Sequence, residues 1–293
     1  MALFCILVWG LSYPVTRAAV QEIPPLSLAF ARFSLAACLV WPLTRKFPKR
    51  IDRQDRFSIC CLGIAGVSLY FGFENYGLKY TTASHAALII ATIPLFTEMV
   101  VAIRSRRRPA TRVWLGSFVA LGGVAVLIGP GEGGATLLGD VLMFGAVAAW
   151  VWYSFLVERL AGRYPNLQLT QAILVVGTVS FFPGAVAEMM LTPIPWPSSA
   201  ALGGVVFLGV FCSALGYHLW NQAIPALGVS ATNNLLYVLP LVGVSGGIVM
   251  LGEPLSAGVV VGGSMVLGGV CLASRLEKTA SASGRSTGKD APP

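Results

Sequence analysis

The chain has 293 residues, of which 56% are hydrophobic and only 11% are charged. Soluble globular proteins carry roughly 25% charged residues, so this composition excludes a soluble enzyme. With a mean hydropathy of +0.76, it indicates a polytopic membrane protein. The net charge of +8 does not indicate a nucleic-acid partner. The basic residues lie in short loops between apolar runs and not on one soluble face.

Ten apolar runs are long enough to cross a membrane, which takes about 20 residues as a helix. The first run begins almost at Met1 without a basic segment before it, so we interpret it as a spanning helix and not as a signal peptide. The sequence therefore predicts an all-α integral membrane protein, followed by a disordered polar tail at 275–293. The predicted helices are 2–20, 26–44, 57–77, 85–103, 112–129, 139–158, 170–190, 201–221, 231–251 and 256–274.

The positions of Lys and Arg predict the orientation. Of the 20 basic residues, only Arg17, Arg32 and Lys79 lie outside the tail and the loops after the second, fourth and sixth helices. Short loops rich in Lys and Arg stay in the cytoplasm. We therefore expect both termini to be cytoplasmic and the protein to lie in the cell (inner or plasma) membrane.

The second half of the sequence resembles the first at an offset of 146 residues. The aligned residues include Asn75 with Asn221, Ser84 with Ser230, Pro94 with Pro240, and Gly122-Gly123 with Gly268-Gly269. This predicts two five-helix repeats, at 1–129 and 139–274. Because five is odd, the repeats must cross the membrane in opposite senses. Inverted repeats of this kind are a recurrent design of secondary transporters.

Charged residues within the predicted helices are candidates for function, because each costs roughly 2.5–3.5 kcal/mol at mid-bilayer. Arg32 lies inside the second helix and Glu74 near the end of the third, at similar depth. One interpretation is a structural ion pair between them. The other is that Arg32 attracts a substrate carboxylate while Glu74 serves as a protonatable group.

The two histidines and four amides leave alternatives open. His85 and His218 are candidates for proton coupling or for hydrogen-bonded packing; with Glu74, His218 is the stronger proton-coupling candidate. Because the histidines lie far apart without a third plausible ligand, we expect no metal site. The amides either cap helix ends or contact substrate. They are Asn75, Asn221, and the pair Asn233 and Asn234, which is expected to open the ninth helix.

Two pairs of aromatic residues occupy comparable places in the first and sixth helices. They are Trp9 with Tyr13 and Trp150 with Tyr153. Aromatic residues often form a belt at the membrane surface, but Trp9 and Trp150 lie toward the middles of their helices. Lining of a central cavity is the alternative, and stacking there suits flat or cationic substrates.

Other residues have structural interpretations. All six cysteines lie in apolar runs and are expected to be small buried side chains. Glu98 and Glu188 are expected to reach the membrane surfaces or to pair with basic residues of the loops. Glycines such as Gly268 and Gly269 are expected to let helices approach closely.

Several short motifs, in order along the chain, resemble the EamA-type branch of the drug/metabolite transporter superfamily. The resemblance covers the chain up to the tail and implies a ten-helix fold with a central cavity and alternating access. One departure is that Gly252-Glu253-Pro254 aligns with the basic run 106–108 of the first half. The motifs are Trp9-Gly10, Pro25 with Ala31-Arg32-Phe33, Thr82-Ala83-Ser84 to Pro94, Gly139-Asp140 to Trp150, Gly228 to Pro240, and Gly252 to Ser256.

The leading hypothesis is a secondary transporter that exports amino acids or similar metabolites. The alternative within transport is uptake of a vitamin, such as riboflavin, or of a nucleotide-like compound. The sequence has no phosphate-binding Gly-rich loop for ATP and no nucleophile motif, so we predict neither a cofactor nor catalytic residues, and an intramembrane enzyme is a remote alternative. The expected partners are a small-molecule substrate and the lipid bilayer; a homodimer is left open.

Overall fold

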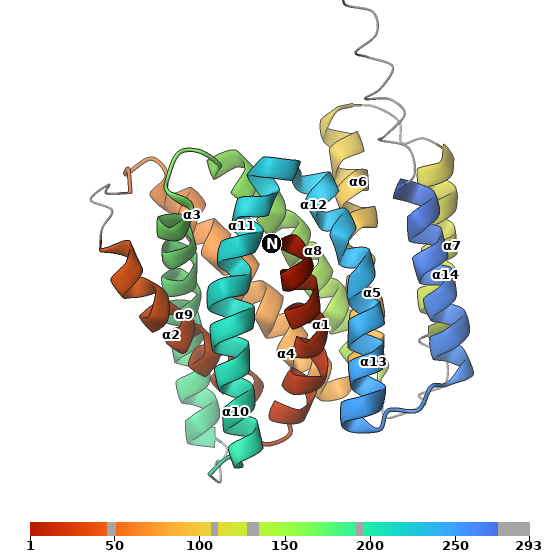
Figure 1. Ribbon diagram of the computed structural model, residues 1–293, viewed down its shortest axis with the longest axis horizontal. Coiled ribbons are helices and arrows are strands. Elements are labelled where there is room, and N and C mark those ends of the chain that lie inside the picture. The colour runs from red at the N-terminus through yellow and green to blue at the C-terminus, as the bar shows by residue number, and fades with distance from the viewer. Residues whose placement is uncertain (46–50, 107–110, 128–134, 192–195, 275–293) are drawn as a thin grey trace, which may run out of the picture.

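The elements of the structure are helices, as the composition predicts. The computed structural model describes residues 1–45, 51–106, 111–127, 135–191 and 196–274, and this part contains no strand. Eight helical segments within it have the length and composition to cross a membrane, and two shorter apolar helices complete the ten predicted runs. They pack side by side as one bundle (Figure 1).

Each half of the described chain has five such segments in succession. Those of the first half are α1 (Ala2–Ala19), α2 (Pro25–Thr44), α3–η1–α4 (Arg56–Gly63, Ile64–Leu69, Tyr70–Tyr80), α5–α6 (Ala83–Ile90, Ile93–Arg104) and α7 (Thr111–Leu127). Those of the second half are α8 (Leu137–Leu160), α9 (Asn166–Leu191), α10–η3–α11 (Ser199–Phe207, Leu208–Leu215, Gly216–Leu227), α12–η4–α13 (Val229–Asn234, Leu235–Val238, Leu239–Leu251) and α14 (Ala257–Ser274). The tail predicted at 275–293 lies outside the described residues.

Two irregularities occur at equivalent places in the halves. The third and eighth segments each contain a π-helical stretch, η1 and η3, which overlap at the offset of 146 residues. The fourth and ninth segments are interrupted before Pro94 and Pro240, where single helices were expected. Because proline has no N–H, it cannot bond the carbonyl four residues earlier, and its ring crowds that carbonyl. The carbonyls concerned belong to Ile90 and Leu236.

The packing between the halves is also reciprocal. The second helices of the halves, α2 and α9, pack on each other, and so do the last, α7 and α14, at the right edge of Figure 1. The third segment packs on the sixth through α4 and α8, and the eighth packs on the first through α11 and α1. Exchanging the halves therefore leaves the pattern of contacts in place.

One expectation about the cysteines is wrong, and Glu188 makes a contact that was not expected. The half-buried Glu188 side chain lies at the start of α2. It accepts hydrogen bonds from the backbone N–H groups of Leu26 and Ser27, at 3.1 and 2.8 Å, and so caps the start of α2. Of the cysteines, Cys5 and Cys212 are buried, but the other four are partly or fully exposed on helix surfaces. An apolar side chain on that surface meets lipid, which is as apolar as the core.

Candidate functional site

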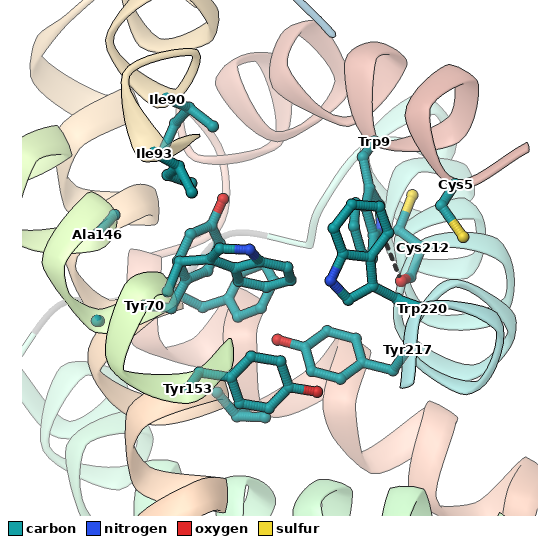
Figure 2. Packing of buried hydrophobic residues seen from close by; sticks show 14 of the residues in the cluster. Cys5, Trp9, Tyr70, Ile90, Ile93, Ala146, Tyr153, Cys212, Tyr217 and Trp220 are labelled. Atoms are coloured by element: carbon teal, nitrogen blue, oxygen red, sulfur yellow. Dashed lines mark hydrogen bonds between the residues drawn. The ribbon is translucent and has the colours of Figure 1, made fainter. Parts of the chain in front are cut away.

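A small cavity lies among helices of both halves, with a volume of about 20 Å³. Figure 2 shows aromatic side chains from several helices facing one another around it. The lining residues from the first half are Trp9, Ser12, Tyr13, Arg32, Tyr70, Phe71, Glu74, Ile90 and Ile93. Those from the second half are Trp150, Tyr217, Leu236 and Leu239.

Aromatic rings form most of the wall. The rings of Trp9 and Trp150 lie 5.3 Å apart between centroids and nearly perpendicular, at 86°. Tyr70 packs on Trp150 at 4.9 Å. The indole N–H of Trp9 donates to the Cys212 carbonyl at 2.9 Å, the dashed line in Figure 2, which fixes the ring across the two halves. Edge-to-face packing of this kind makes a well-ordered wall.

Arg32 brings a buried positive charge to this wall. The side chain comes from α2 and is 1% exposed. Its Nε–H donates to the Ser213 hydroxyl at 3.0 Å, and the guanidinium lies 4.5 Å from the Phe71 ring centroid. Its Nη1 has no hydrogen-bond partner among the described residues. A buried charged group without a partner is costly, so Nη1 is suited to an anionic group of a ligand.

Glu74 from α4 supplies a carboxylate to the same cavity and is 2% exposed. Its Oε1 accepts a hydrogen bond from the Tyr70 hydroxyl at 3.1 Å, whereas Oε2 has no partner within the described chain. Glu74 and Arg32 form no ion pair in this structure, which differs from the structural alternative considered above. The cavity thus holds one cationic and one carboxylate side chain that do not neutralise each other by contact.

The apolar part of the cavity follows the internal repeat. At the offset of 146 residues, Ile90 aligns with Leu236 and Ile93 with Leu239, and all four line the cavity at the interruptions before the two prolines. The charged part does not follow the repeat. Arg32 aligns with Thr178 and Glu74 with Trp220, neither of which lines the cavity. Both charges therefore come from the first half alone.

The four predicted amides do not line this cavity, and three of them bond to other helices. Asn75 donates to the Pro25 carbonyl at 2.9 Å, and Asn221 donates to the Thr170 hydroxyl at 3.2 Å. Each therefore holds an early turn of the second helix of its own half. Asn233 does not open the ninth segment, because α12 already begins at Val229. It lies deeper and donates to the Thr97 hydroxyl at 2.9 Å.

Two further candidates also stand apart from the lining. Tyr153 packs beneath it, 5.1 Å from Trp150 between centroids, and its hydroxyl donates to the Asn221 side-chain oxygen. His218 is half-buried, with its ring nitrogens 3.2 Å from the Asn166 amide and 3.1 Å from the Gln222 amide. These contacts favour a packing role for His218.

Several lining residues were not among the sequence candidates, notably Tyr70, Phe71 and Tyr217. The internal repeat contained one indication of these residues. Phe71 and Tyr217 align at the repeat offset, just after the two π-helical stretches. Because a π-helical turn changes which residues face inward, regular helical spacing does not identify them.

Known proteins resemble the chain over nearly its whole length. The EamA-like transporter family matches residues 1–129 and 137–275. This chain belongs to the EamA-like transporter family. A transporter of Archaeoglobus fulgidus is 28% identical to it over 270 residues, 91% of this chain and 95% of the relative. The transporter YyaM of Bacillus subtilis is 30% identical over 280 residues, 90% and 89% of the two chains.

One relative of this EamA-like protein carries a more specific name. A probable terminal-alkyne amino-acid exporter of Streptantibioticus cattleyicolor is 28% identical over 275 residues, 92% of this chain and 91% of the relative. A solved crystal structure that is 20% identical superposes with a TM-score of 0.69 over 94% of this chain and 97% of its own. That likeness concerns the fold. The chain is thus a multi-pass membrane transporter, and its cavity is the candidate site for a small-molecule substrate.

Proposed function

We propose that this EamA-like transporter is a secondary active exporter of amino acids or amino-acid-like compounds, working by alternating access. One observation carries the proposal. The cavity contains a buried guanidinium with an unpartnered nitrogen and a buried carboxylate with an unpartnered oxygen. A zwitterion supplies the opposite charge to each of them.

The two ends of an α-amino acid match these groups chemically. Its carboxylate is a charge-assisted hydrogen-bond acceptor for Arg32. Its ammonium group is a donor for Glu74, and the faces of Trp9 and Trp150 attract it further. The remaining wall, with Ile90, Leu236 and their neighbours, suits an apolar side chain. Because the cavity is narrow, we expect a small substrate and some movement of the lining side chains on binding.

The repeat and the relative support the transport cycle. Two halves with reciprocal packing can exchange their arrangements, so a site between them faces each side in turn. The exporter of Streptantibioticus cattleyicolor favours the outward direction and the amino-acid class. Glu74 is the proposed proton-coupling group in the cavity. The basic loops favour cytoplasmic termini in the cell (inner or plasma) membrane.

A thermal-stability screen of the purified protein tests the substrate class. We expect one or more of the standard amino acids to raise the melting temperature by about 5 °C at 100 times the dissociation constant, where bound ligand adds about 2.7 kcal/mol. Matched compounds with one charge removed serve as controls. For leucine these are 3-methylbutylamine and 4-methylpentanoate, and both should stabilise the protein far less.

The outcome that contradicts the proposal is equally specific. Stabilisation by riboflavin or nucleotide-like compounds, with no response to any amino acid, favours the uptake alternative. Equal stabilisation by the amino acid and its decarboxylated amine shows that Arg32 does not hold a carboxylate.

A further inference from the structure

A second buried charged cluster lies outside the cavity, at the starts of α5 and α8. His85 Nδ1 lies 3.3 Å from one oxygen of Asp140 and 3.4 Å from the other. The Thr81 hydroxyl donates to the same carboxylate at 2.5 Å. His85 is 5% exposed and Asp140 is 1% exposed. Asp140 belongs to one of the sequence motifs on which the family resemblance rests. It does not line the cavity, so the proposed substrate site gives it no role.

The pair joins the two halves of the transporter. His85 belongs to α5 in the first half, and Asp140 to α8 in the second. The same end of the bundle carries another contact of this kind. Glu253 of the second half accepts from the backbone N–H groups of Ala83 and Ser84 of the first half, at 2.7 and 3.0 Å. This end is therefore closed by polar contacts that must break if the halves separate there.

The surroundings of Asp140 offer a hydroxyl donor and a helix start to its carboxylate. It lies in the first turn of α8, after the N-cap residue Thr136. Unpaired backbone N–H groups at a helix start favour a negative charge, and the hydrogen bond from Thr81 favours it too. Histidine is the side chain that ordinarily gains or loses a charge between pH 5 and 8, and His85 is the histidine of this pair.

Few other titratable groups face His85 from the elements packed against α5. From α1, the Arg17 guanidinium donates to the Leu78 carbonyl at 2.6 Å. From α4 there are Glu74 in the cavity and the exposed Lys79, and from the loop after α13 there is Glu253. The described parts of α7, α13 and α14 have no Asp, Glu, Lys or His, and Arg112 lies at the far end of α7.

We propose that His85 and Asp140 form a proton-operated latch that closes this end of the transporter. Neutral His85 donates its Nδ1–H to the Asp140 carboxylate. When Nε2 of the same ring takes a proton from water, His85 becomes an imidazolium. The hydrogen bond, which until then has a charge only on its carboxylate acceptor, now joins two opposite charges and becomes stronger. By linkage, protonation favours the closed conformation, and closure favours protonation.

The latch lies at the end opposite the basic loops, which is the external end in the orientation proposed above. Acid outside the cell then favours the externally closed state, and the latch loosens as the pH rises. For an exporter, this helps the empty carrier close to the outside and return to the cytoplasmic side. The latch itself does not depend on the identity of the substrate.

Double electron–electron resonance, which measures the distance between two spin labels, tests the latch without any substrate. Labels at the exposed positions Gln21 and Leu138, one in each half, report on separation of this end in a version with all six cysteines replaced by alanine. We expect the ratio of closed to open populations to fall about tenfold between pH 5.5 and 8, as a tenfold difference in proton affinity between the conformations requires. Glu22, at the same end, does not titrate there, because its hydrogen bonds from the backbone and hydroxyl of Ser198 lower its pKa.

The His85→Asn variant is expected to give the alkaline ratio at both pH values, because asparagine can donate to Asp140 but cannot become charged. His85→Gln provides a second variant if the first is not monodisperse. The matched control is His218→Asn, which should retain the full pH response. A wild-type ratio that is constant with pH overturns the proposal. So does a wild-type response that persists in His85→Asn or disappears in His218→Asn.

Discussion

Replacing Arg32 with glutamine is expected to lower kcat/KM for amino-acid transport about 100-fold, which corresponds to about 3 kcal/mol. Glutamine can keep the hydrogen bond to Ser213 but has no charge to pair with a substrate carboxylate. The initial rate of labelled amino-acid uptake into proteoliposomes, measured over a range of concentrations, checks this. Transport of an amine without a carboxylate, if it occurs at all, should change much less.

Arg112→Gln is the matched control for this variant. Arg112 lies at the exposed start of α7, far from the cavity in the described structure. The same substitution there should leave transport within about twofold of the wild type, because a single exposed charge contributes little. Normal transport by Arg32→Gln at normal expression would show that Arg32 does not bind the substrate carboxylate.

Replacing Gly269 with alanine is expected to destabilise the protein by about 2–3 kcal/mol, because the added carbon has no space. A Cβ at this position would lie 2.5 Å from both the Ala120 backbone nitrogen and the Gly116 backbone oxygen. Backbone atoms cannot turn away as a side chain can, so α7 and α14 must separate. The melting temperature in detergent should fall by about 5–10 °C.

The neighbouring residue supplies the control. A Cβ at Gly268 meets nothing within 4 Å. Gly268→Ala should therefore be neutral or stabilising, since alanine favours a helix over glycine by about 1 kcal/mol. If both variants melt at the same temperature, close packing of α7 on α14 does not contribute to stability in the way described.

The spans were predictable because lipid imposes a simple requirement on length and apolarity. The predicted runs and the described helices overlap throughout, although the sixth to eighth helices begin or end several residues farther out. The interruptions in the fourth and ninth segments were not predicted. Pro94 and Pro240 marked them, but proline alone does not show whether a membrane helix bends or breaks.

The candidate site was predictable only in part. The apolar predicted helices contain five polar or aromatic candidates that all line the cavity: Arg32, Glu74, Trp9, Tyr13 and Trp150. The buried amides were candidates as well, yet Asn75, Asn221 and Asn233 bond to neighbouring helices. Sequence position shows that a polar group needs a partner, but not whether that partner is a helix or a ligand.

The His85–Asp140 contact shows the same limit at longer range. The residues are 55 positions apart and each lies at a helix start. The predicted helices 85–103 and 139–158 placed both residues at helix starts, but nothing in the sequence indicated that these starts meet. Their contact depends on how α5 packs against α8, which is set by many apolar contacts and not by any one motif.

Counterflow in proteoliposomes tests the substrate assignment most directly. Vesicles loaded with an unlabelled amino acid that stabilises the protein are diluted into a trace of the labelled compound. The proposed function predicts transient accumulation of label inside the vesicles, which is absent when the vesicles are loaded with the matching decarboxylated amine. Counterflow of vitamins or nucleotide-like compounds, without counterflow of any amino acid by the same monodisperse protein, would contradict it.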